Sequence, residues 1–229
     1  MEPDRILIKV LTFNRPKPLK RLLNSLSEAD FRGDVADVEI WVDGPRGGKS
    51  TPDRDEVISF ARRFKWPYGK VAVTVRDENV GLVGNWLGCW SDVDPDDFRT
   101  AVLILEDDME VSPLFWRWLK QAWGKYALRS DLAGVSLQHQ HTRSSDGSSA
   151  FHVSNGDAPY LYKIPGSWGF SPHPKAWRSF LDWQKEKAGA GYEPNTLQFQ
   201  GRDVITTKWW KDMRGQGKDP RMWTQWYMT

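Results

Sequence analysis

The sequence lacks several features that would narrow its function. Its 229 residues include one cysteine, Cys89, which excludes an internal disulfide and a cysteine-ligated zinc site. No apolar run approaches the roughly 20 residues that a membrane-spanning helix needs, and the N-terminus does not resemble a signal peptide. The formal net charge is only +2, so electrostatics give no general case for a nucleic acid partner.

Tryptophan, by contrast, is abundant. There are fourteen tryptophans, and seven of them lie from Trp168 onward, in a region with few aliphatic runs. The indole ring has an apolar face and one hydrogen-bond donor, which suits a surface that binds sugars. The same residues would equally fill a core that is short of leucine and isoleucine, so both interpretations stay open at this point.

The first 137 residues alternate strand-like and helix-like segments. Strands are expected at residues 6–13, 38–42, 71–75, 101–105 and 132–137, and helices at residues 18–26, 53–64, 82–90 and 113–126. This alternation predicts an α/β fold with a mostly parallel sheet and helices on both faces. Residues 138–229 suggest a polar loop, a hairpin at 151–164 and helices at 174–183 and 203–213. We interpret them as an elaboration of the same domain, truncated in its C-terminal part.

Residues 101–113 (AVLILEDDMEVSP) hold the most informative pattern. A short aliphatic run, typical of a buried parallel strand, ends in Glu106, Asp107 and Asp108. Clustered carboxylates repel each other unless a cation neutralises them, and Mg²⁺ or Mn²⁺ is the natural partner for such oxygen ligands. The alternative is a polar turn before a helix, because acidic residues favour helix N-termini.

Polar residues also follow the other predicted strands. Asn14 and Arg15 follow the first strand, Asp43 follows the second, and residues 76–79 follow the third. Parallel strands place all of these and the acidic triplet on one edge of the sheet, where such folds bind ligands. A basic group, a single acid and a metal-type acid cluster are the layout expected for a nucleoside diphosphate.

Residues 43–50 (DGPRGGKS) suggest a different nucleotide site. They approach the phosphate-binding pattern G-x-x-x-x-G-K-[ST], but Asp43 stands at the first glycine position and Gly44 is one residue too close. A P-loop nucleotide hydrolase therefore remains an alternative hypothesis.

Taken together, four segments resemble the GT-A nucleotide-sugar glycosyltransferases, which have a Rossmann-like α/β fold. The likeness is greatest to inverting N-acetylglucosaminyltransferases of the N-acetylglucosaminyltransferase I and protein O-mannose type, and extends to family-2-like transferases. The segments are ILIKVLTFNRPKPLKRLLNSL, VEIWVDGP, RDENVGLVGNW and AVLILEDDMEVSPLFW. The likeness covers roughly residues 5 to 120, and IPGSWGFSPHPKAW and WWKDMR resemble the acceptor loop and a later motif.

The resemblance implies an activity. It implies a metal-dependent inverting transfer of a sugar, such as N-acetylglucosamine, from a UDP-sugar to a hydroxyl of a glycan or glycoconjugate, with Mn²⁺ or Mg²⁺ as cofactor. Residues 1–137 would bind the nucleotide-sugar, and residues 138–229 would form the acceptor side. The compartment would be the Golgi or another secretory lumen if an anchor precedes this chain, and otherwise the cytoplasm. A non-catalytic sugar-binding domain of the same fold is a further alternative.

The resemblance also implies roles for single residues. Arg15 would contact the nucleotide, Asp43 would read the uracil ring, and Asp108 would ligate the metal. Asp212 would be the catalytic base, with Asp182 as a rival. Further donor contacts are expected from Thr12, Asn14, Asn79, Glu106 and Asp107, and acceptor contacts from Trp168 and Gly169.

Overall fold

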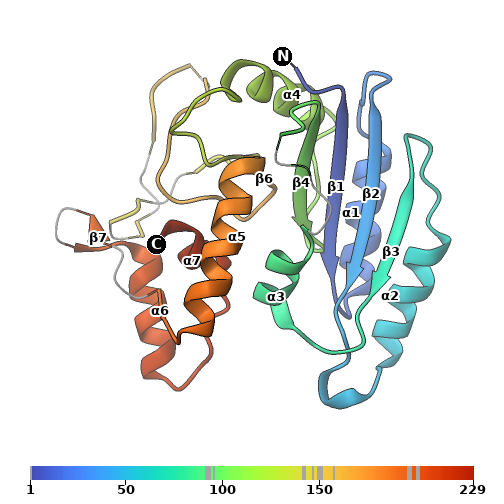
Figure 1. The fold of residues 1–229 in the computed structure, drawn as a ribbon. Coiled ribbons are helices and arrows are strands. Elements are labelled where there is room, and N and C mark those ends of the chain that lie inside the picture. The colour runs from blue at the N-terminus through green and yellow to red at the C-terminus, as the bar shows by residue number, and fades with distance from the viewer. Residues whose placement is uncertain are drawn as a thin grey trace.

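The computed structural model describes residues 2–90, 94, 96–140, 143–145, 147–148, 152–156, 158–194, 198–199 and 202–229. One sheet organises this part of the chain, in the order β3-β2-β1-β4-β6-β5. The first four strands along the chain are parallel, whereas β6 runs antiparallel to both of its neighbours (Figure 1). Their bounds are β1 Arg5–Thr12, β2 Val35–Val42, β3 Val71–Val75, β4 Thr100–Glu106, β5 Gly134–Ser136 and β6 Phe170–Pro172.

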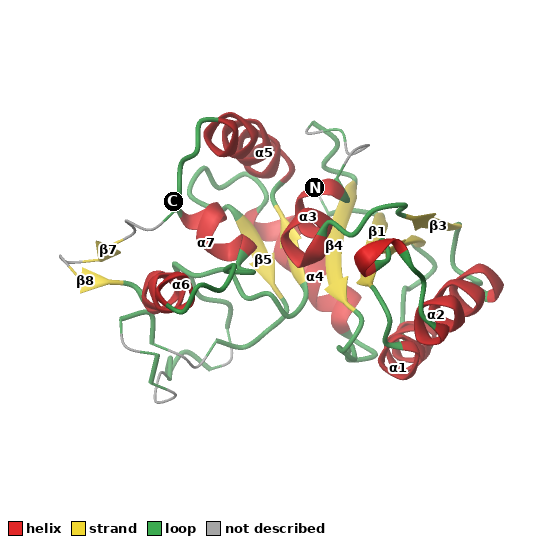
Figure 2. Cartoon of the chain, turned by 90° about the horizontal axis from the view of Figure 1, so that it is seen from below, coloured by secondary structure: helices red, strands yellow, loops and turns green. Residues whose placement is uncertain are grey.

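Helices cover both faces of this sheet, as Figure 2 shows for α1 and α2 on one side and α3 and α5 on the other. The helices are α1 Pro16–Ser27, α2 Pro52–Arg63, α3 Gly81–Gly88, α4 Phe115–Tyr126, α5 Pro174–Gly189, α6 Ile205–Gly215 and α7 Trp223–Met228. A 3₁₀ turn at Arg46–Gly48 precedes α2, and the short strands β7 (Gln198–Phe199) and β8 (Arg202–Asp203) precede α6.

The two faces have different cores. On the α1 and α4 side the core is mainly aliphatic, because the leucines of α1 recur at helical spacing and are fully buried against alternate residues of the strands. On the α3, α5 and α7 side the core is aromatic, and Trp86, Trp177 and Trp223 are each at most 2% exposed. Core packing therefore accounts for these tryptophans, whereas Trp168 and Trp209 remain exposed.

The predicted fold class is confirmed, and the five strands and four helices expected before residue 137 are all present with small shifts of their ends. The prediction was wrong in part for the residues after 137. The described residues of 151–164 contain no strand, while Phe170–Pro172, to which the sequence assigned no element, forms β6 between β4 and β5. Residues 151 and 157 lie outside the described part. Sequence alone could not find β6, because three residues carry too little periodicity to mark a strand.

Within the described residues, no helix has the length and apolar character required to cross a membrane. The division of the chain at residue 137 stays a prediction, and the sheet itself takes strands from both sides of that division.

Candidate functional site

The site lies where the order of the strands reverses. From β1 the chain moves through α1 to β2 on one side, whereas β4 pairs with the other side of β1. In open α/β sheets the crevice beyond the carboxyl ends of two such strands is the usual place for a ligand. Leu11 is in register with Glu106, so the segments that follow β1 and β4 lie next to each other at this crevice.

Arg15 bridges this crevice. Its Nη1 donates to Asp108 Oδ2 at 2.7 Å, and its Nη2 donates to Asp107 Oδ1. Partial burial works against the charge of Arg15, but the two carboxylates outweigh it and raise the pKa of the guanidinium. The Arg15 side chain is 47% exposed, so it remains accessible to a ligand in the crevice.

The three acids of the triplet have different surroundings. Asp107 is 1% exposed and accepts a hydrogen bond of 2.6 Å from Thr12 Oγ1, while the Asp108 side chain is 46% exposed. Glu106 accepts a bond of 3.1 Å from the indole Nε1 of Trp86. Burial raises the pKa values of Glu106 and Asp107, and the neighbouring acids add to this effect.

These surroundings decide how a divalent cation would be held. No group of three or more His, Cys, Asp or Glu side chains in the described part of the chain forms a metal cage. Among the three acids of the triplet, only Asp108 has an exposed side chain, since Asp107 is enclosed by Thr12 and Arg15 and Glu106 is partly buried. The donor set therefore fits the mode in which one or two carboxylates and the oxygens of a bound diphosphate share the ion.

Asp43 follows β2 and is almost fully buried. Its Oδ1 accepts hydrogen bonds from the backbone N–H of Gly44 (2.8 Å) and Val80 (3.0 Å), and its Oδ2 accepts from Gly81 N (3.0 Å) and Asn79 Nδ2 (2.9 Å). Both oxygens are thus engaged, mainly by the loop between β3 and α3. The carboxylate fixes the position of this loop at the sheet edge.

Two further features hold Asp43 in place. A Cβ atom on Gly44 would lie 2.0 Å from the backbone carbon of Glu78, so only glycine allows this close approach. Arg54 of α2 is 6% exposed, and it donates to the carbonyl oxygens of Asp43 (2.8 Å) and Arg76 (3.1 Å). Sequence reasoning missed Arg54, although a charged residue in line with the buried Val57 and Ala61 of α2 was a usable signal.

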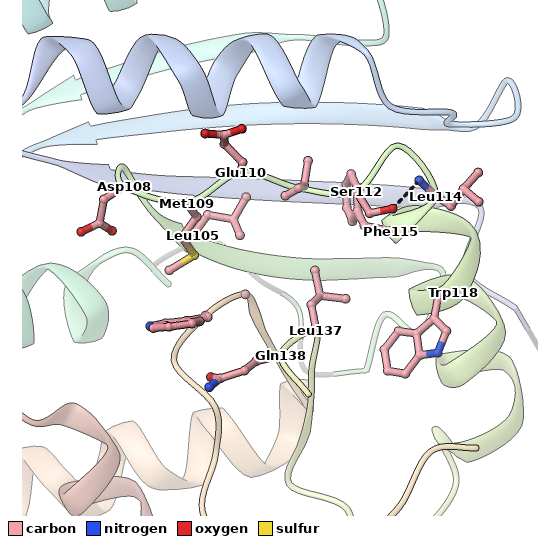
Figure 3. Close-up of a pocket in the computed structure, with 13 residues that line it drawn as sticks. Leu105, Asp108, Met109, Glu110, Ser112, Leu114, Phe115, Trp118, Leu137 and Gln138 are labelled. Carbon is pink, nitrogen blue, oxygen red and sulfur yellow. Dashed lines mark hydrogen bonds between the residues drawn. The ribbon is translucent and has the colours of Figure 1, made fainter. Parts of the chain in front are cut away.

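A pocket of about 770 Å³ opens beside Asp108, on the face of the sheet that α4 covers (Figure 3). Asp108, Trp168 and Gly169 all line it, so the structure brings together the predicted metal ligand and both predicted acceptor residues. Gly169 has φ +78°, and the backbone N–H of Leu137 donates to its carbonyl at 2.8 Å. This left-handed conformation, which favours glycine, sets the direction in which Trp168 leaves the loop.

The predicted bases lie elsewhere. Asp212 is exposed on α6 and Asp182 is exposed on α5, and neither lines this pocket. α5 also packs on the aromatic core, across the sheet from the pocket. Asn14, in contrast, is half-buried beside Arg15 at the crevice.

The P-loop alternative conflicts with the local geometry. In that motif the lysine and the hydroxyl residue belong to the start of the helix, where backbone N–H groups hold the phosphates. Here α2 begins only at Pro52, which has no N–H, and Thr51 Oγ1 caps it by accepting from Arg54 N at 3.3 Å. Lys49 is exposed and has an extended backbone outside the helix.

Comparisons of sequence found no matching family model and no matching curated protein. Comparison of structures found the mannosyltransferase PcManGT from Pyrobaculum calidifontis in complex with GDP-Man and Mn²⁺, with a TM-score of 0.50 and 13% identity over 80% of this chain and 48% of that one. Residues 1–349 of S. aureus TarS align with a TM-score of 0.48 and 14% identity, over 76% of this chain and 48% of that one. This chain thus spans about half the length of the mannosyltransferase chain and about half of residues 1–349 of TarS. At such identity the likeness is one of fold, and this chain shares the α/β fold of the mannosyltransferase.

Proposed function

We propose that this chain is a metal-dependent inverting glycosyltransferase. It would move a sugar from a UDP-sugar to a hydroxyl of a glycan or glycoconjugate, with N-acetylglucosamine as the first sugar to test. One observation carries the proposal: Arg15 and the acidic triplet face each other across the crevice between β1 and β4. The shared fold with a mannosyltransferase that binds GDP-Man and Mn²⁺ supports a nucleotide-sugar as donor.

In this proposal Arg15 would bind the diphosphate and Asp108 would bind the metal. A diphosphate in the crevice would attract the exposed guanidinium of Arg15 away from the carboxylates. Asp108 would then be released to hold Mn²⁺ or Mg²⁺ together with the phosphate oxygens. Such an ion supplies charge stabilisation for a nucleoside diphosphate as it leaves. Glu106, Asp107, Thr12 and Asn14 would hold the neighbouring sugar and ribose in place.

Asp43 and Asn79 would define the site of the base. Because both Asp43 oxygens are occupied by backbone and side-chain donors around the β3–α3 loop, we assign Asp43 a positioning role in addition to any contact with uracil. The loop then presents its own polar groups to the base. This assignment differs from the simple expectation that the carboxylate alone reads the ring.

The acceptor would enter the pocket lined by Trp168 and Gly169. A carboxylate must take the proton of its hydroxyl as that oxygen attacks the anomeric carbon, and a single displacement inverts the configuration. We assign this role to Asp212, with Asp182 as the rival, on the resemblance alone. Since neither residue lines the pocket, a non-catalytic sugar-binding domain is the second candidate function.

Turnover separates the two functions. The purified chain would be incubated with UDP-N-acetylglucosamine, UDP-glucose or UDP-galactose, a mixture of glycan acceptors and Mn²⁺, and UDP release would be measured. A transferase releases UDP only with metal and acceptor, and the rate falls at least about a hundredfold in the variant that removes its base, Asp212→Asn or Asp182→Asn. Donor binding without turnover under every condition would support the non-catalytic alternative.

A further inference from the structure

The pocket beside Asp108 extends well beyond the acidic triplet. Figure 3 shows Asp108 at one end and Trp118 of α4 at the other, with Met109 and Gln138 between them. The volume of about 770 Å³ lies in the upper part of the usual range for ligand pockets, about 300–1,000 Å³. A single hexose ring has about a dozen heavy atoms and fills on the order of 200 Å³, so one sugar would leave most of this space empty.

The lining combines apolar rings with a few polar groups. Trp118 and Trp168 are 38% and 66% exposed, which is unusual for large aromatic residues that border one pocket. An indole face packs against the C–H groups of a sugar ring, and side chains such as Gln138 bond with its hydroxyls. A lipid tail would have no use for these polar groups, whereas a sugar chain uses both kinds of contact.

The charge of the lining decides which classes of sugar chain the pocket would accept. Asp108 and Glu110 contribute carboxylates, and the described residues that line the pocket include no cationic side chain. Asp108 is paired at 2.7 Å with Arg15, which lies outside the lining, so Glu110 is the carboxylate that bears on a sugar chain here. Glu110 is 61% exposed, and its ion pair with Arg21 at 3.5 Å is long and solvated, so it neutralises little of this charge. A chain that carries phosphates or carboxylates would be repelled by Glu110, but an uncharged chain would not.

The walls of the pocket are tied together before any ligand binds. Besides the bond between Leu137 N and Gly169 O at 2.8 Å, the backbone N–H of Gly166 donates to Ser136 Oγ at 2.9 Å. These bonds join the loop that carries Trp168 to β5. A preformed wall lowers the entropy cost of binding a flexible chain.

We propose that this pocket is a subsite for an uncharged oligosaccharide of at least about two sugar units, which extends from Asp108 to Trp118. The inference rests on the proposed function, because it names the acceptor of the same site. Binding of the oligosaccharide itself needs neither donor nor turnover. The two claims can therefore be tested apart.

The test is calorimetric titration of the whole chain with neutral ladders, manno- and chito-oligosaccharides of one to four units, and with oligogalacturonides of matching length as the anionic contrast. Affinity for at least one neutral ladder should rise with length, and the anionic ladder should bind more weakly at every length. In Trp118→Ala the tetramer should lose about five- to tenfold in affinity while the monosaccharide is unaffected, and Trp118→Phe should restore most of the loss.

The matched control is Trp209→Ala, which removes a tryptophan of α6 that is 45% exposed and does not line the pocket, and it should leave oligosaccharide binding unchanged. Far-UV circular dichroism would verify that each variant is folded. The inference is overturned if no neutral ladder binds, if anionic chains bind as tightly, or if Trp118→Ala keeps the length dependence. Titration of UDP with Mn²⁺ on the same samples tests the proposed function separately: UDP binding without oligosaccharide binding overturns only the inference, and the reverse overturns only the donor site.

Discussion

Replacement of Asp43 by asparagine should destabilise the protein far more than its small change in shape suggests. The carboxylate accepts four hydrogen bonds, two on each oxygen, within a site that is 4% exposed. In Asp43→Asn one oxygen becomes an amide N–H₂ group, which faces two donors and can accept from neither. Two bonds to a charged acceptor are lost, and each contributes about 1.5–3 kcal/mol.

The expected cost is therefore about 3–6 kcal/mol, a large part of a typical free energy of unfolding of about 5–15 kcal/mol. Urea denaturation followed by tryptophan fluorescence measures it, with the midpoint and slope fitted together. The control is Asp77→Asn, which changes an exposed acid in the same loop and should stay within about 0.5 kcal/mol of the parent.

The result also decides what Asp43 does. A stable Asp43→Asn protein, within about 0.5 kcal/mol of the parent, would refute the four-bond arrangement. If that stable variant also failed to bind UDP, direct reading of the base would explain the residue better than a positioning role.

Further outcomes are expected at three other residues. Gly169→Ala should cost about 1–2 kcal/mol in urea unfolding and raise the acceptor KM, because a side chain there is strained at φ +78° and meets Leu137 atoms 3.1–3.3 Å away. Cys89 should resist iodoacetamide at pH 8 until urea unfolds the chain, because burial raises the pKa of its thiol from 9.0 to about 12. As the pH rises, the thiol of the unfolded chain ionises before the buried thiol of the folded chain does. The stability that Cys89 contributes as a neutral thiol is therefore complete below pH 9 and is lost between about pH 9 and 12, which urea denaturation at a series of pH values would measure. Trp223→Ala should lower the free energy of unfolding by about 3–5 kcal/mol, because it empties a buried site. It should also weaken donor binding, because Trp223 stacks with a ring-centroid distance of 4.1 Å on Trp86, whose indole N–H bonds to Glu106. Unchanged donor binding in a folded variant would show that Trp223 does not act on the site through Trp86.

The parallel core could be predicted because each segment carries its own signal. The leucines of α1 recur at helical spacing, the aliphatic run of β4 fits a doubly buried strand, and Gly and Pro mark the turns. Parallel pairing then places the strand ends, with Arg15 and the acidic triplet, on one edge. Nothing beyond local patterns was needed for that step.

The features that escaped prediction depend on contacts between distant segments. β6 is defined by its antiparallel partners β4 and β5, and its three residues have no period to read. The role of Arg54 depends on carbonyl groups just after the ends of β2 and β3, and the role of Trp86 depends on the position of Glu106. The sequence cannot identify the catalytic base for the same reason, because a carboxylate takes that role only when it lies within reach of the acceptor hydroxyl.

The most direct test of the central claim is calorimetric titration of UDP, with GDP and ADP for comparison, with and without Mn²⁺. We expect UDP to bind best and only with the metal, Asp108→Ala to abolish binding, and Lys49→Ala to leave it intact. The metal alone should bind weakly, since the described residues offer no complete cage for it. If Lys49→Ala abolished binding while Asp108→Ala did not, or if UDP bound equally well without a divalent ion, the assignment of the donor site to the crevice between β1 and β4 would be wrong.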